Sequence, residues 1–155
     1  MASLNPWSPV EARRHLASPA EAVWAVLSDP YTYPHWLVGA QRIRSVDPGY
    51  PAPGTAFHHS VGPVDEVTVD DSTEVLASDP PRLLILRVHL GPLQGTVEMR
   101  VVSDSVSTEV RFREVPTGPG RLLTPLVRPL LHGRNMESLR RLDGLLSREA
   151  ADPLS

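Results

Sequence analysis

A chain of 155 residues with a net charge of −3 is long enough to bury one full hydrophobic core. Its charges of both signs are interspersed, which gives no argument for nucleic-acid binding, and the absence of cysteine excludes disulfides and thiolate metal sites. No apolar run approaches the ~18 residues of a membrane span and the N-terminus lacks the pattern of a secretory signal, so we expect a cytoplasmic protein.

The basic residues have a biased composition. All 15 are arginine, there is no lysine, and proline reaches 17. Arginine, alanine, proline and glycine use GC-rich codons, whereas lysine, isoleucine and asparagine use AT-rich codons. We therefore attribute the arginines to a GC-rich bacterial genome and do not interpret them as a phosphate-binding or RNA-binding pattern.

The first predicted elements are a strand over residues 10–17 and a short helix after it. Ser18 suits the N-cap of that helix, Pro19 its first position, and Glu21 completes a capping box. The next apolar residues recur at helical spacing and also fill the adjacent face, which predicts a helix buried on more than one side: Ala20, Ala22, Val23, Trp24, Ala25, Val26 and Leu27.

A second short helix is predicted directly after the first. Asp29-Pro30 ends the first helix, because the residue before a proline is disfavoured in the α region. Asp29 can also cap the second helix, and Tyr33-Pro34 limits that helix to one or two turns. We expect Trp36, where the second helix closes, to be buried beneath the end of a sheet.

The period then changes from helical to alternating, which predicts six further strands. Turns rich in glycine, proline and aspartate separate them, and their shortness favours an antiparallel meander. We expect a bulge near residues 70–72. The predicted strands cover residues 41–46, 55–61, 65–77, 82–90, 93–102 and 106–115.

The last two strands have one apolar and one charged face, so opposite charges can pair across them. In strand 82–90 both faces are equally apolar, which leaves open whether Arg87 and His89 point inward. The apolar face of the sheet needs a cover.

A long C-terminal helix is the predicted cover. Thr124 can cap it, Pro125 suits its first position, and the pattern continues to about Glu149. Arg134 is expected mainly on the outer side. The predicted inward stripe is Leu131, Asn135, Met136, Leu139, Leu142, Leu145 and Leu146.

The stretch SPAEAVWAVLSDPYTYPHWL, residues 18–37, resembles the signature of the polyketide cyclase/dehydrase and lipid transport superfamily, the START-like helix-grip proteins. The resemblance continues through residues 51–62, 74–87 and 134–146, and it implies one α+β helix-grip domain over residues 8–149. In that fold a curved antiparallel sheet of about seven strands wraps a long C-terminal helix, with two short helices after the first strand. The matching residues are Pro19, Val23, Trp24, Leu27, Asp29, Pro30, Tyr33, Trp36 and Leu37.

The resemblance also implies a cavity between sheet and helix, of at least ~300 Å3, that accepts a hydrophobic molecule. The alternative is that the same side chains fill a solid core. The residues expected to line the cavity are Phe57, His59, Met99, Phe112, Leu131, Asn135, Met136 and Leu139.

The side chains that could act in catalysis or bind a metal do not form a known catalytic motif. His58 and His59 are adjacent on a strand, so they point to opposite faces and cannot share a metal ion. No motif for zinc, nucleotide or dinucleotide binding or for a nucleophilic serine is present, so we expect no metal and no cofactor. His59 is a hydrogen-bonded polar group, a surface residue or a catalyst. Asn135 either bonds to a loop or to the short-helix junction near Trp36, or orients a ligand.

The leading hypothesis is non-catalytic binding or transport of a small hydrophobic molecule, lipid-like or polyketide-like. One alternative, implied by the resemblance, is a cyclase, aromatase or dehydratase that folds a flexible substrate in its cavity. A second alternative is a protein-interaction module. No nucleic-acid partner and no membrane-spanning segment are expected, and the sequence names neither the ligand nor the oligomeric state.

Overall fold

The computed structural model describes residues 8–40, 42–61, 69–90, 93–104 and 107–151. In this part of the chain seven strands form one antiparallel sheet, ordered β1-β7-β6-β5-β4-β3-β2. The strands are β1 (Val10–Leu16), β2 (Arg42–Val46), β3 (Ala56–Val61), β4 (Val69–Asp79), β5 (Leu83–Leu90), β6 (Leu93–Ser103) and β7 (Thr108–Thr117). The helices are α1 (Ala20–Leu27), α2 (Tyr33–Trp36) and α3 (Thr124–Ala151), with 3-10 turns η1 (Pro30–Thr32) and η2 (Pro119–Leu123).

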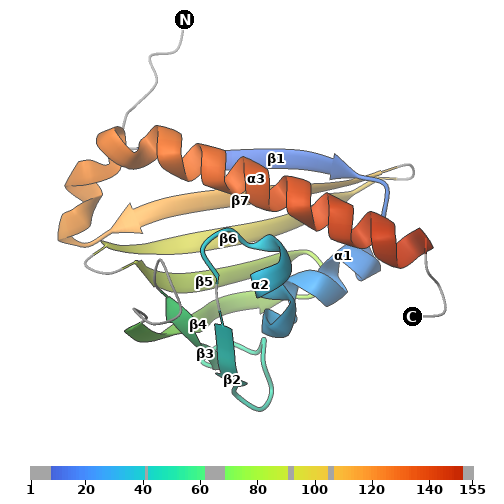
Figure 1. Ribbon diagram of the computed structural model, residues 1–155, viewed down its shortest axis with the longest axis horizontal. Helices are drawn as coiled ribbons and strands as arrows, with labels where there is room; N and C mark the ends of the chain where they lie inside the picture. Colours follow the sequence, from blue (N-terminus) through green and yellow to red (C-terminus); the bar gives the residue numbers. More distant parts are fainter. Residues whose placement is uncertain (1–7, 41, 62–68, 91–92, 105–106, 152–155) are drawn as a thin grey trace, which may run out of the picture.

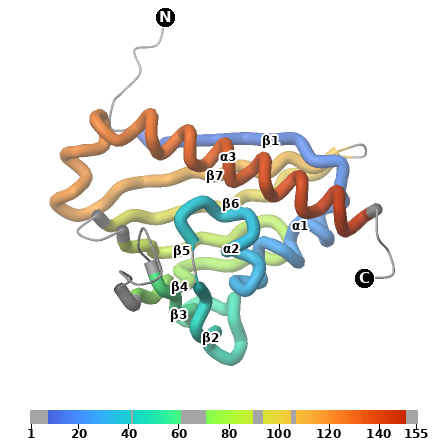
Figure 2. The backbone as a smooth tube through the Cα atoms, in the orientation of Figure 1, coloured from blue at the N-terminus to red at the C-terminus, as the bar shows by residue number. Residues whose placement is uncertain are grey.

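The long helix lies across the sheet. Figure 1 shows α3 running beside β1 and β7, while α1 and α2 lie over the middle strands. The backbone tube in Figure 2 gives the same arrangement. Helix α3 packs against β1 and α2, and α1 packs against β6. The predicted α+β helix-grip fold is therefore confirmed. Of the helices in the described chain, none combines the length and apolarity that a bilayer span requires.

The core fills the space between the sheet and the helices. Trp36 has no exposed surface, as predicted, and its Nε1 donates to Thr32 Oγ1 at 3.1 Å. Its ring meets Tyr33 edge-on at 5.5 Å between centroids and Phe112 at 5.8 Å. These contacts join the short helices to β7, so the aromatic cluster fixes where α2 sits on the sheet.

Two predicted helix caps are wrong and one is confirmed. Pro19 is the N-cap of α1, and the carbonyl of Ser18 instead accepts from Thr108 Oγ1 at 2.7 Å. Thr124 Oγ1 donates to the Arg121 carbonyl, because η2 continues directly into α3 and the threonine is already helical. Asp29 does cap the second helical piece, since its Oδ1 accepts from the Tyr31 amide at 3.0 Å.

The strand register differs from the prediction near residues 70–72. Strands β3 and β4 pair without interruption there, and the irregularity in β4 falls between Val75 and Ala77, opposite β5. The structure also decides the orientation of β5. Leu84 and Leu86 are buried, whereas Arg87 is exposed and lies 3.7 Å from Glu74.

The predicted turns at residues 62–63 and 91–92, and the start of the strand predicted at residue 106, lie outside the described residues. On the outer face of the sheet, several ion pairs join residues two apart on one strand, such as Glu98 and Arg100 at 2.7 Å. His15 of β1 lies 3.1 Å from Glu109 of β7, a contact across strands, but not between the two strands for which pairing was predicted.

Candidate functional site

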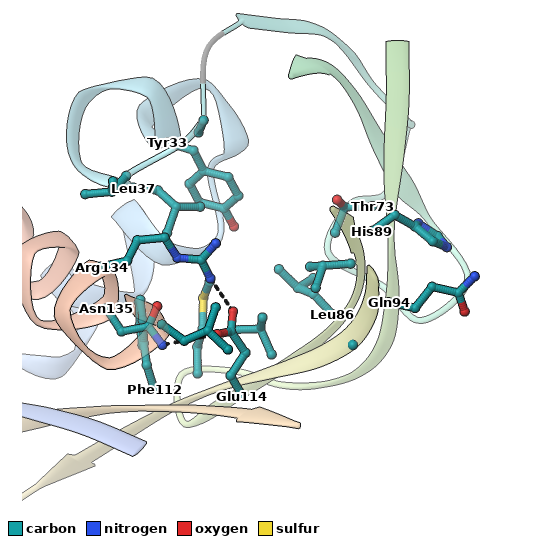
Figure 3. Close-up of a pocket in the computed structure, with 18 of the residues that line it drawn as sticks. Tyr33, Leu37, Thr73, Leu86, His89, Gln94, Phe112, Glu114, Arg134 and Asn135 are labelled. Carbon is teal, nitrogen blue, oxygen red and sulfur yellow. Dashed lines mark hydrogen bonds and ion pairs between the residues drawn. The ribbon is translucent and has the colours of Figure 1, made fainter. Parts of the chain in front are cut away.

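A cavity of about 220 Å3 lies between the concave face of the sheet and helices α2 and α3. It is smaller than the ~300 Å3 expected from the sequence. Its wall is mostly apolar, with side chains from strands β2 to β7, from α3 and from Tyr33 of α2. Figure 3 shows the polar residues of the wall grouped at opposite ends of the cavity. The apolar lining includes Leu37, Ile43, Phe57, Leu86, Val88, Val97, Met99, Phe112, Val127 and Leu131.

Six of the eight predicted lining residues lie at this cavity: Phe57, His59, Met99, Phe112, Leu131 and Asn135. Met136 does not. Met136 follows Asn135 on α3, and a step of one residue rotates the side chain by about 100° around the helix, toward solvent. Its side chain is 36% exposed, so the predicted inward position is wrong. Leu139 is fully buried but lies one turn beyond Asn135, where it packs in the core instead of lining the cavity.

The acidic and the basic residue of the cavity wall, Glu114 and Arg134, were not among the predicted lining residues. Glu114 has the same strand parity as the buried Val110 and Phe112, so alternation along β7 would have placed it inward. Arg134 was expected on the outer side of α3, yet it lines the cavity. It lies three residues after Leu131 and next to Asn135, on the edge of the inward stripe.

Glu114, Arg134 and Asn135 form the polar end of the cavity. Arg134 Nη2 donates to Glu114 Oε1, and Asn135 Nδ2 donates to Glu114 Oε2 at 3.4 Å. The glutamate is buried, and the arginine side chain is 26% exposed. Arg134 Nε is enclosed and has no partner among the described residues. The site therefore joins a neutralised ion pair to an apolar chamber.

The partner of Asn135 is thus a carboxylate and not the short-helix junction that the sequence analysis offered. Another residue of α3, Ser138, makes the hydrogen bond to the segment after the short helices. Ser138 is fully buried, and its Oγ accepts from the Val38 amide at 3.0 Å and donates to the Arg134 carbonyl at 2.9 Å.

His59 is a second polar group in the wall. Its Nε2 lies 3.0 Å from Thr73 Oγ1, and its ring is tilted against Phe57. Burial lowers the pKa of His59 below 6.5, and this effect outweighs the nearby Asp71 carboxylate, which raises it. The imidazole is therefore neutral at pH 7. Its neighbour His58 faces the opposite side and lies 3.1 Å from Asp47.

The remaining polar groups are committed elsewhere or lie at the margin. The Tyr33 hydroxyl donates to the Leu27 carbonyl and lies 3.3 Å from the Tyr50 hydroxyl, and burial raises the pKa of Tyr33 well above 10.0. Tyr33 thus lines the cavity as an uncharged side chain whose hydroxyl already has a partner. Figure 3 shows His89 and Gln94 extending away from Arg134. Among the described residues, no group of histidines and carboxylates could hold a metal ion.

Comparison with known proteins identifies one family. A family model described as polyketide cyclase / dehydrase and lipid transport matches residues 9–146. A search of curated proteins finds no match for the chain.

Several solved structures have the same fold. A protein from Nitrosomonas europaea superposes with a TM-score of 0.75 at 19% identity, covering 96% of this chain and 99% of its own. A Rhodobacter sphaeroides protein gives 0.74 at 21% identity, covering 91% and 93%. The di-domain ARO/CYC protein StfQ of the steffimycin biosynthetic pathway gives 0.70 at 13% identity, covering 93% of this chain and 53% of its own. Identities this low establish similarity of fold alone.

Proposed function

This chain belongs to the polyketide cyclase/dehydrase and lipid transport family, and we propose that it binds a small hydrophobic molecule between its sheet and α3. The observation that carries the proposal is the cavity itself, a mostly apolar chamber with an ion-paired polar cluster at the α3 end, formed by Glu114, Arg134 and Asn135. Apolar walls favour a ligand through surface removed from water, and a few polar groups set its orientation.

The cavity volume limits the size of the ligand. About 220 Å3 is below the ~300–1,000 Å3 of pockets for drug-sized molecules, so the ligand is compact, of the order of two fused rings or a short acyl chain. A larger molecule requires α3 or the loop after α2 to move outward. Both flank the cavity, through Val127 and Leu131 of the helix and Leu37 to Ala40 of the loop.

The proposal is tested by thermal unfolding with and without 2-ethylnaphthalene, a compact apolar probe. A ligand that binds the folded state alone raises the midpoint by mass action, so the probe should raise it, whereas glucose and AMP should not. The Val88→Phe variant should abolish this shift. Val88 of β5 lines the cavity and pairs with Gly95 of β6, so the larger phenylalanine ring would occupy the cavity.

The matched control is Val102→Phe on β6. Val102 is 40% exposed on the outer face of the sheet, so the same change of side chain there should leave the ligand-dependent shift intact. Equal midpoint shifts in the Val88→Phe variant and the wild type would contradict binding in this cavity. Failure of the wild type to respond to any apolar probe would favour the protein-interaction alternative.

A cyclase or dehydratase is the second candidate. The supporting observation is that His59, whose pKa burial lowers, lines the cavity, because a neutral imidazole can accept a proton from a substrate. The likeness in fold to StfQ, described as an ARO/CYC protein, agrees with this candidate. Incubation with a linear poly-β-ketone and mass spectrometry of the products tests it. Loss of 18 mass units that is abolished by His59→Gln would favour catalysis.

A further inference from the structure

We propose that Arg134, with Glu114 as its buried counterion, selects ligands that present a neutral oxygen acceptor, such as a ketone or an amide carbonyl, over ligands that present a carboxylate. This inference rests on the proposed binding function and names the chemistry of the ligand. It makes Arg134 a specificity-determining residue of the cavity.

The first argument is the unused hydrogen-bonding capacity of the guanidinium. Arginine has five N–H donors, and within the described residues Nη2 alone has a partner, the Glu114 carboxylate. The enclosed Nε has none. A ligand oxygen that reaches the accessible part of the guanidinium gains a charge-assisted hydrogen bond, which is stronger than a hydrogen bond between neutral groups.

The second argument is the position of the guanidinium. Arg134 lines the cavity, and Figure 3 shows its side chain extending from α3 toward Leu86 on the opposite wall, beside the ring of Tyr33. The Tyr33 hydroxyl already donates to Leu27, and His59 already bonds with Thr73. Arg134 is therefore the charged donor group that a ligand meets at the α3 end of the cavity.

The third argument concerns charge. Glu114 already neutralises Arg134, and Asn135 holds the second carboxylate oxygen. A ligand carboxylate at the guanidinium would add a second negative charge beside Glu114, where the apolar surroundings strengthen like-charge repulsion. A neutral carbonyl oxygen accepts a hydrogen bond from the free N–H groups of Arg134 without that repulsion. The buried counterion thus decides to which kind of ligand oxygen Arg134 donates a hydrogen bond.

Three probes of nearly equal shape test the inference: 2-ethylnaphthalene, 2-acetylnaphthalene and 2-naphthoate. Dissociation constants come from calorimetric titration of the wild-type protein at pH 7.5. The acetyl compound should bind roughly tenfold more tightly than the ethyl compound, the gain of one hydrogen bond to a charged donor. The naphthoate should bind more weakly than the acetyl compound.

The decisive variant is Glu114→Gln. Loss of the counterion leaves the guanidinium positive, so 2-naphthoate should become the tightest ligand, with an affinity roughly tenfold above its wild-type value. The Glu137→Gln variant removes an exposed carboxylate from the same helix as Arg134 and is the control, because its partners Arg140 and Arg141 lie at the surface. It should leave the order of the three probes unchanged.

A second variant covers the case in which Glu114→Gln does not fold. The double variant Arg134→Met with Glu114→Gln carries no charge at this end and should bind the ethyl and acetyl compounds within about twofold of each other. Equal affinities of all three probes for the wild type, or tightest binding of naphthoate, would overturn the inference and leave the proposed function standing. Failure of all three probes to bind would overturn both.

Discussion

A buried ion pair such as Glu114 and Arg134 costs desolvation energy, so its contribution depends on both partners being present. Glu114→Gln leaves a guanidinium without its counterion, and we expect a loss of about 2 kcal/mol in unfolding free energy, less than for a fully buried pair because Arg134 is partly exposed. Adding Arg134→Met should restore most of the loss, since no charge remains. Urea unfolding of both single variants and the double variant measures this.

The control for that cycle is Glu137→Gln, which breaks the exposed pairs with Arg140 and Arg141. Exposed pairs contribute little, so the unfolding free energy should not change measurably. A double variant less stable than either single variant would show that the side chains at positions 114 and 134 contribute through packing and not through charge.

His59 should make stability depend on pH. Burial holds its pKa in the folded state below 6.5, so the unfolded chain binds the proton more readily. The stability from this residue is complete above pH 6.5 and is lost as the pH falls below that value toward the lower folded pKa. Between pH 7.5 and 5.5 the wild type should lose more unfolding free energy than His59→Gln, which keeps a partner for Thr73.

Other titrating groups, such as His58 beside Asp47, are present in both proteins, so the difference between wild type and variant isolates His59. Denaturant unfolding at a series of pH values gives the two curves. Parallel curves over this interval would show that the imidazole is as free to protonate in the folded state as in the unfolded chain.

Trp36 is the residue whose removal should cost most. Trp36→Ala deletes a fully buried ring and the hydrogen bond from its Nε1 to Thr32, so we expect a loss of ~3–5 kcal/mol and a fall of about 10 °C in the thermal midpoint. Tyr31→Ala is the control, because Tyr31 lies in the same short segment and is 56% exposed. Calorimetry measures both; similar midpoints for the two variants would contradict the tight packing of the Trp36 ring.

At the scale of elements, Ser138 links α3 to the segment after α2. Ser138→Ala leaves the Val38 amide without its side-chain acceptor, so that amide should exchange with solvent about tenfold faster and the fold should lose about 1 kcal/mol. Exchange followed by NMR measures this. Ser147→Ala changes an exposed serine of the same helix and should leave the Val38 rate unchanged.

Element types were predictable from local chemistry, whereas caps and strand ends were less so. Asp29 caps as predicted because its partner, the Tyr31 amide, is two residues away and needs no tertiary contact. The predicted caps at Ser18 and Thr124 failed because β7 and η2 engage those residues instead. Thr108 is 90 residues from Ser18, whereas Arg121 is three residues before Thr124, so a distant partner and a local one account for the two failures.

At the scale of the whole molecule, the resemblance to START-like proteins predicted the sheet and the gripped helix, and alternation predicted the inward Phe57, Met99 and Phe112. At the polar end of the cavity Asn135 was predicted, whereas the ion pair beside it was not. That pair joins Glu114 of β7 to Arg134 of α3, and the contact depends on how the helix is placed on the sheet. No periodicity within one element contains that information.

The order of the strands has a consequence for how the chain folds. Strand β1 is at one edge of the sheet and pairs with β7, from Val10 opposite Glu114 to Leu16 opposite Thr108, although every other strand lies between them in the sequence. Pairing of distant segments is slow, because the entropy of closing a long loop is lost before the contact forms. During synthesis β1 therefore has no strand to pair with until β7 has left the ribosome.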